Sequence, residues 1–153
     1  MAKNFLLQHN FGFDINKKVD AADSASDWLK LGSGVKGMEI DNNEETDEFY
    51  YYDGGGNAES AVTGQQKSFE FECDRDYNDP AQNYIFNTLA HTIGPERDVA
   101  IRVTYPDGTK LTGPGTVTDI KEPSGEANKR GECGFTLKFA GKPTITPGKA
   151  VGV

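Results

Sequence analysis

Histidine, cysteine, methionine and tryptophan are scarce in this 153-residue chain, which has two residues each of the first three and one tryptophan. So few thiol and imidazole groups cannot form the Cys and His clusters that bind zinc or iron. The sequence also lacks the Walker phosphate-binding signature and the serine-centred GxSxG pattern. We therefore expect no catalytic residues, no metal and no cofactor, and we do not expect an enzyme.

Long hydrophobic runs are missing as well. Hydrophobic residues make up 35% of the chain, and no run of them is long enough to cross a bilayer. Near the N-terminus, the apolar run at residues 5–7 is too short and its surroundings too polar for a signal peptide. These features predict a protein of the cytosol in which it is made, with no membrane partner.

Positive charge is absent from residues 37–66, which contain eight acids and neither Lys nor Arg. Because the chain has 24 acids and 16 bases, this window alone accounts for the net charge of −8. Such acidity is unsuited to binding nucleic-acid phosphates. The window also contains an aromatic run at residues 49–52 and three glycines at residues 54–56. We interpret it as a surface that meets other copies of the chain or repels an anion.

Alternating apolar and polar residues predict half-buried strands, most clearly at residues 67–74 and 98–105. We expect a single domain, residues 1–153, that is mainly β: a β-sandwich or open barrel of about seven strands with one packed α-helix. The remaining strands are expected at residues 27–31, 35–41, 48–52, 109–121 and 132–140. Residues 14–26 and 53–64 are predicted to be loops, residues 1–12 an N-terminal arm, residues 42–66 a long acidic loop and residues 141–153 a flexible tail.

One helix is predicted over residues 81–92. Asp79 is a candidate N-cap and Pro80 suits the first helical position, where its missing N–H has no cost. Ala81, Ile85 and Leu89 recur every four residues and define one apolar face. The Gly-Pro pair at residues 94–95 then ends the helix.

The remaining polar candidates favour structural roles. Cys73 and Cys133 fall on the apolar faces of predicted strands, which favours buried free thiols over the alternative, a disulfide. Residues 74–78 resemble the start of a calcium-binding loop, but its sixth and twelfth positions hold Asp79 and Ile85 in place of Gly and Glu. His9 and His91 have no ligand partner within metal spacing, so we expect them to be structural.

Four segments carry a family resemblance through their order and spacing: MAKNFLLQHNFGFDIN at residues 1–16, WLKLGSGVKGMEIDNNEETDEFYYYDGGG at 28–56, TGQQKSFEFECDRDYNDPAQNYIF at 63–86 and GFTLKFAGKP at 134–143. Over nearly its whole length the chain resembles the major tail tube proteins of long-tailed bacteriophages (siphophages), particularly those of Gram-positive hosts. No single motif is diagnostic.

The resemblance implies a structural virion protein of the phage tail, assembled in the cytoplasm of the host bacterium. Six protomers would form a ring, with a β-hairpin from each contributing to a continuous inner barrel, and rings would stack into a tube. The implied partners are other copies of the chain, the tape measure protein, the tail terminator and the distal tail protein. DNA would pass through the lumen without specific binding.

The resemblance also implies that the acidic loop, residues 42–66, contacts neighbouring rings and that the two termini reinforce stacking. Negative charge near the bore would keep phosphates from adhering. The candidate contact residues are Asp47, Phe49, Tyr50, Tyr51, Tyr52, Gly54, Gly55, Gly56, Phe5 and Leu6. The candidate bore or interface acids are Glu39, Asp41, Glu44, Glu45 and Glu48.

A second hypothesis stays open from the sequence alone. A monomeric β-sandwich could bind carbohydrate or protein, with Trp28 and the tyrosines at residues 50–52 as an aromatic platform. Electron microscopy of concentrated protein separates the two hypotheses, because only the first predicts rings or tubes.

Overall fold

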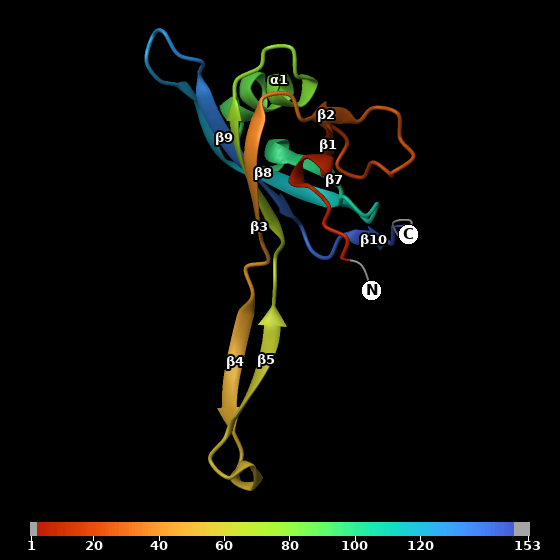
Figure 1. Cartoon of the computed structure of the whole chain (residues 1–153), viewed down its shortest axis with the longest axis vertical. Coiled ribbons are helices and arrows are strands. Elements are labelled where there is room, and N and C mark those ends of the chain that lie inside the picture. Colours follow the sequence, from red (N-terminus) through yellow and green to blue (C-terminus); the bar gives the residue numbers. More distant parts are fainter. Residues whose placement is uncertain (1–2, 149–153) are drawn as a thin grey trace.

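A computed structural model describes residues 3–148 of the chain (Figure 1). These residues form ten strands, one α-helix and four short 3-10 turns. The strands are β1 (Gly12–Asn16), β2 (Leu29–Leu31), β3 (Val35–Asp41), β4 (Glu45–Tyr50), β5 (Ala58–Gly64), β6 (Ser68–Asp74), β7 (Asp98–Thr104), β8 (Lys110–Ser124), β9 (Glu132–Phe139) and β10 (Thr144–Thr146). The helix α1 spans Pro80–Asn87, and the 3-10 turns are Gln8–Asn10, Tyr52–Gly54, Leu89–His91 and Gly94–Arg97.

Eight of the strands form one antiparallel sheet. Its order is β2-β1-β7-β8-β9-β6-β3, and β10 pairs with the first part of β8, at residues 110–112. The other two strands, β4 and β5, form a separate two-stranded ribbon that extends from the ends of β3 and β6 (Figure 1). The mainly β fold with one helix is therefore confirmed.

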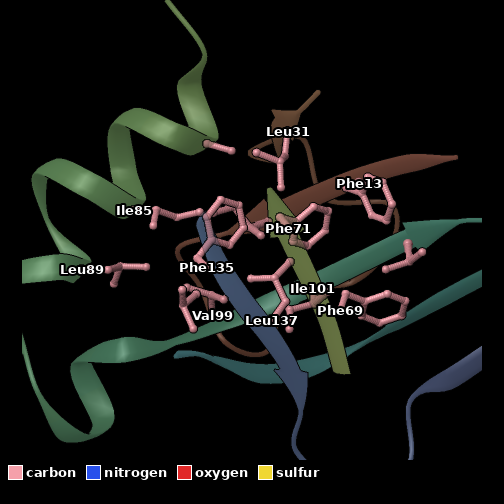
Figure 2. Packing of buried hydrophobic residues seen from close by; sticks show 14 of the residues in the cluster. Phe13, Leu31, Phe69, Phe71, Ile85, Leu89, Val99, Ile101, Phe135 and Leu137 are labelled. Atoms are coloured by element: carbon pink, nitrogen blue, oxygen red, sulfur yellow. The ribbon is translucent and has the colours of Figure 1, made fainter. Parts of the chain in front are cut away.

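The main sheet curls around its own core. Phe13 of β1 meets Phe71 of β6 with ring centroids 4.8 Å apart, although three strands lie between β1 and β6 in the sheet. This contact requires the sheet to bend until its two halves face each other, as in an open barrel. Phe69, Phe135 and Leu137 fill the space between the halves and are almost fully buried (Figure 2).

The helix covers one side of this core. The Asp79 carboxylate accepts a hydrogen bond from the Gln82 backbone N–H at 3.2 Å, and Pro80 is the first helical residue, so the predicted cap is confirmed. Ile85 and Leu89 point into the core and have no exposed surface (Figure 2). None of the helices in residues 3–148 is long and apolar enough to cross a membrane.

The helix is shorter than the predicted range of residues 81–92. Regular α-helix ends at Asn87, and Thr88 departs from it with φ of −118°. Leu89–His91 then forms a 3-10 turn. Leu89 still reaches the core from this turn. The four-residue spacing of apolar side chains therefore continues beyond the point where the backbone changes from α-helical to 3-10 hydrogen bonding.

The prediction of a loop at residues 14–26 is wrong for its first three residues. Gly12–Asn16 is strand β1, which lies between β2 and β7. Phe13 and Ile15 point into the core, while Asp14 points outward and pairs with Arg102 at 3.1 Å. The polar residue between two apolar ones is the expected alternation of a strand, but the segment is too short for the pattern to stand out.

Two more segments predicted to be irregular are strands. Ala58–Gly64, expected to be loop, is β5, and Thr144–Thr146, inside the expected flexible tail, is β10. Both strands are largely exposed, so neither shows the apolar periodicity that a core strand needs. The last five residues of that expected tail, residues 149–153, lie outside the described residues.

Candidate functional site: an exposed ribbon, an acidic sheet face and two free edges

The β4–β5 ribbon is exposed on both of its faces. Thr46, Glu48 and Tyr50 of β4 lie opposite Val62, Ser60 and Ala58 of β5 on one face. Asp47 and Phe49 occupy the other face, opposite Ala61 and Glu59. Tyr50 is 66% exposed and Val62 is 59% exposed. Since a two-stranded hairpin with no covered face is only marginally stable in water, the ribbon is a surface that a partner would stabilise.

Most of the predicted contact residues lie together on this ribbon. The Phe49 and Tyr51 rings meet at 5.2 Å, and Tyr52 and Gly54 form the 3-10 turn at its far end. Gly55 and Gly56 have left-handed φ angles of 63° and 84°, which suit glycine. Phe5 and Leu6 are also exposed, but they belong to the N-terminal segment before β1.

The root of the ribbon is fixed to the body by hydrogen bonds. Asn43 adopts a left-handed φ of 46°, which Asn tolerates better than most residues. Its side-chain amide donates to the Gln66 carbonyl and to Ser68 Oγ, both at 2.9 Å. The Gln66 N–H donates to the Asn42 carbonyl, also at 2.9 Å. The ribbon is therefore held in a defined direction from the body (Figure 1).

An acidic face covers the outer side of β3 and β6. Glu39 of β3 lies directly opposite Glu70 of β6, and Glu72 is the next outward residue of β6. Like charges directly opposite each other in a sheet are destabilising, so folding alone does not favour this pair. A groove of about 720 Å³ on the same side is lined by Glu39, Glu70 and Glu72, with Lys121 of β8.

The structure divides the predicted bore acids into two groups. Glu39 and Asp41 lie on the outer face of β3, whereas Glu44, Glu45 and Glu48 belong to the ribbon and its root. The sequence analysis did not include Glu70 and Glu72 among the site residues. Their alternation with buried Phe69 and Phe71 already indicated an outward face, but only the pairing of β3 with β6 brings Glu70 beside Glu39.

Two strand edges of the main sheet are free on opposite sides of the acidic face. β3 ends the sheet, and pairing of β7 with β8 stops at Thr116. Among residues 3–148, residues 117–124 of β8 therefore pair only with β9. This stretch contains register shifts and a left-handed φ of 53° at Asp119, features that bend a strand. Within the described part of the chain, the section β3-β6-β9-β8 thus has one unpaired edge on each side.

The aromatic platform of the second hypothesis is not assembled. Trp28 lies just before β2, where its Nε1 donates to the Ala22 carbonyl at 3.1 Å. The Arg102 guanidinium lies over the Trp28 ring at 4.6 Å. Arg102 also pairs with Asp14 and Asp23, so Trp28 is part of a structural cluster on the body. The tyrosines at residues 50–52 are on the ribbon instead.

The calcium-like segment is occupied by structural contacts. Asp74 pairs with Lys36 at 3.2 Å and with Arg130 at 3.1 Å. Asp76 accepts hydrogen bonds from the Ser33 hydroxyl and the Asn78 backbone N–H, and the Ser33 hydroxyl holds the pKa of Asp76 below its ordinary value. Within residues 3–148, no group of three or more His, Cys, Asp or Glu side chains is placed to hold a metal ion.

Comparison with known proteins gives matches by structure alone. No protein-family model and no curated protein sequence matches the chain. One similar chain comes from the tail of an empty gene transfer agent particle, refined with C6 symmetry. The match covers 95% of this chain and 100% of that chain, with a TM-score of 0.67 and 18% identity. A chain from the virion of the native gene transfer agent particle has the same coverage, a TM-score of 0.66 and 17% identity.

A third similar structure comes from the cap that terminates the tube of the anti-feeding prophage. It matches 95% of this chain and 93% of its own chain, with a TM-score of 0.56 and 17% identity. At such identities the likeness concerns the fold. The chain thus has the fold of subunits found in a particle tail, a virion and a tube cap.

Proposed function

We propose that this chain is a self-assembling structural subunit of a phage-type tail tube, in which six copies form a ring and rings stack. The observation that supports this best is the β4–β5 ribbon, which exposes aromatic side chains on a strand pair with no covered face. The shared fold adds support, because one similar chain comes from a particle tail refined with C6 symmetry.

The two free edges supply the contact within a ring. Strand direction alternates through β3, β6, β9 and β8, so β8 runs antiparallel to β3. A neighbouring copy related by rotation about the ring axis can therefore place its β3 antiparallel to residues 117–124 of β8. Each copy contributes four strands, and repetition of this head-to-tail contact closes a barrel without free edges.

The acidic face of β3 and β6 lines the bore in this arrangement. Glu39, Glu70 and Glu72 point away from the core of each copy, so a closed ring repeats them around its axis. Electrostatic repulsion extends about 8 Å at physiological ionic strength, so charges on the wall of a narrow channel act over much of its width. Such a surface would let DNA pass without adhering, because these three carboxylates outnumber the neighbouring Lys121 and repel the phosphates.

The ribbon supplies the contact between rings. It leaves the body in the direction of β3 and β6, and its root is fixed by Asn43. Tyr50, Tyr51 and Tyr52 would be covered by the next ring, and the exposed Phe5 and Leu6 would add to the same stacking contact. The tape measure protein, the tail terminator and the distal tail protein are the partners expected of such a tube in a virion, with assembly in the host cytoplasm.

Negative-stain electron microscopy and light scattering of purified protein at rising concentration test this proposal. We expect six-fold rings or tubes, with a scattering mass that rises with concentration. Circular dichroism on the same samples shows whether the protein is folded. Folded protein that stays monomeric at every concentration, and also in the presence of preformed tail initiator complex, contradicts the proposal.

A further inference from the structure

Cys73 and Cys133 form a buried pair of thiols on adjacent strands. They lie directly opposite each other in the pairing of β6 with β9, and their Sγ atoms are 3.1 Å apart. Both are free cysteines; Cys73 has no exposed surface and Cys133 is 6% exposed. The burial expected from the sequence is confirmed, but alternation alone could not show that the two sulfurs meet.

The backbone spacing of this pair suits a covalent bridge. The Phe139 N–H donates to the Lys67 carbonyl, and the Arg75 N–H donates to the Gly131 carbonyl. Hydrogen-bonded pairs alternate along an antiparallel ladder, so these two bonds place Cys73 and Cys133 in a hydrogen-bonded pair as well. Such pairs have Cα atoms about 5.5 Å apart, inside the range of about 4.4–6.8 Å that disulfides span.

We propose that Cys73 and Cys133 are a latent disulfide site: two thiols when the chain folds in a reducing compartment, and a bridge between β6 and β9 after exposure to peroxide. The bridge is intramolecular, so this inference does not depend on the proposed assembly. It would join the two inner strands of the section β3-β6-β9-β8.

Hydrogen peroxide supplies the oxidising equivalents. The Cys133 sulfur attacks one peroxide oxygen, the O–O bond breaks, and the leaving hydroxide takes the thiol proton to become water. The Cys73 sulfur then attacks the sulfenic acid of Cys133, the S–O bond breaks, and the second hydroxide leaves as water with the Cys73 proton. Two thiols are oxidised to one disulfide, and one peroxide is reduced to two waters.

The surroundings assign Cys133 as the first sulfur to react. Its side chain lies with that of Cys73 on the core side of the sheet, but Cys133 is the more exposed of the two residues. Burial raises the pKa of both thiols. At Cys133 the hydrogen bond with Cys73 and the nearby Arg75 oppose this rise, whereas at Cys73 the hydrogen bond with Cys133 and the Asp79 carboxylate add to it. A small oxidant is required, because a bulky disulfide reagent would not fit between buried strands.

The test is peroxide treatment of the folded, purified wild-type chain, followed by thiol alkylation in denaturant and intact-mass analysis. We expect a mass lower by two hydrogens, no alkylation, and a peptide that joins Cys73 to Cys133. The melting temperature should rise by about 4 °C or more and fall back after reduction. Cys73→Ser and Cys133→Ser serve as matched controls, since each retains one thiol and cannot form the bridge within a chain.

Three results would overturn the proposal. The first is a folded wild-type chain that still alkylates at both thiols, under conditions that oxidise the same chain in denaturant. The second is separate oxidation of each cysteine to sulfinic acid, or disulfides only between chains. The third is a bridge that leaves the melting temperature unchanged or lowers it, since such a bridge does not fit the native spacing of β6 and β9.

Discussion

One buried polar residue of the helix, Gln82, connects α1 to the end of β6 and to the turn before β3. The Gln82 side chain has no exposed surface, and its Nε2 donates to the carbonyls of Ser33 and Asp74. Its Oε1 accepts from the Asp76 N–H at 2.9 Å, so one side chain satisfies three backbone groups. Nothing in its sequence context distinguishes Gln82 from an exposed helical glutamine, because its partners are Ser33, far away in the chain, and the end of β6 with the residues just after it.

The apolar side of the same contact is open to a direct test. Leu89→Asp should unfold the domain, because Leu89 has no exposed surface and an unpaired buried charge costs several kcal/mol, about 3–5 in this setting. Such a loss approaches the whole stability of a small domain. The measurement is urea unfolding followed by circular dichroism, with Leu89→Met as the size-matched control. A soluble Leu89→Asp protein with a cooperative transition at the wild-type midpoint would contradict the burial.

The ion pairs of Asp74 predict a pH dependence. Lys36, which also contacts Glu132, and Arg130 hold the pKa of Asp74 below its ordinary value. A carboxylate with a lowered folded pKa stabilises the fold above its unfolded pKa, and this contribution disappears as the pH falls through the folded value. Asp74→Asn should therefore melt slightly below wild type at about pH 7, and the two curves should converge near pH 2. Equal melting temperatures at both pH values would show that the pairs do not contribute.

At the scale of elements, prediction from sequence succeeded where one face is buried. The alternation of Phe69, Phe71 and Cys73 with acids identified β6, and Asp79 with Pro80 identified the start of α1. β5 was missed because both of its faces are exposed and its residues are small. The pairing partners of each strand could not be predicted, since register depends on contacts distant in sequence; the Glu39–Glu70 pair is the clearest example.

The ribbon predicts a separation of folding from assembly. Replacing residues 44–65 with Asn-Gly keeps β3 and β6 as a hairpin, and it removes both strands of the ribbon. The core lies outside this segment, so the melting temperature should change by no more than a few degrees while tube formation is lost. Calorimetry and negative-stain microscopy measure the two effects, with Tyr50→Ser as a milder variant.

Two outcomes of that replacement are informative in opposite ways. Normal tubes from the shortened chain would mean that the ribbon is a passive surface and that the sheet edges and termini suffice. Loss of the cooperative melting transition would mean that the ribbon is needed by the body itself, and the hydrogen bonds of Asn43 would then be the first contacts to examine.

For the whole molecule, the proposed ring makes a prediction that needs no substitution. Backbone amides on the outer edges of β3 and of residues 117–124 of β8 have no strand partner within the described part of one chain. Pairing of these edges between copies would satisfy the amides and slow their exchange with solvent. β2 also ends the main sheet, at its opposite end, and takes no part in the proposed ring contact, so it serves as an internal control.

Hydrogen exchange followed by mass spectrometry should therefore distinguish edge pairing from other modes of association. On passing from dilute protein to assembled tubes, peptides covering β3 and residues 117–124 should become protected by about tenfold or more in exchange rate, while those covering β2 change little. Protection confined to the ribbon would support stacking between rings but contradict the proposed pairing of strand edges within a ring. Protection at β2 in place of β3 would require a different surface of the sheet to form the ring, with the acidic face of Glu39, Glu70 and Glu72 no longer around its axis.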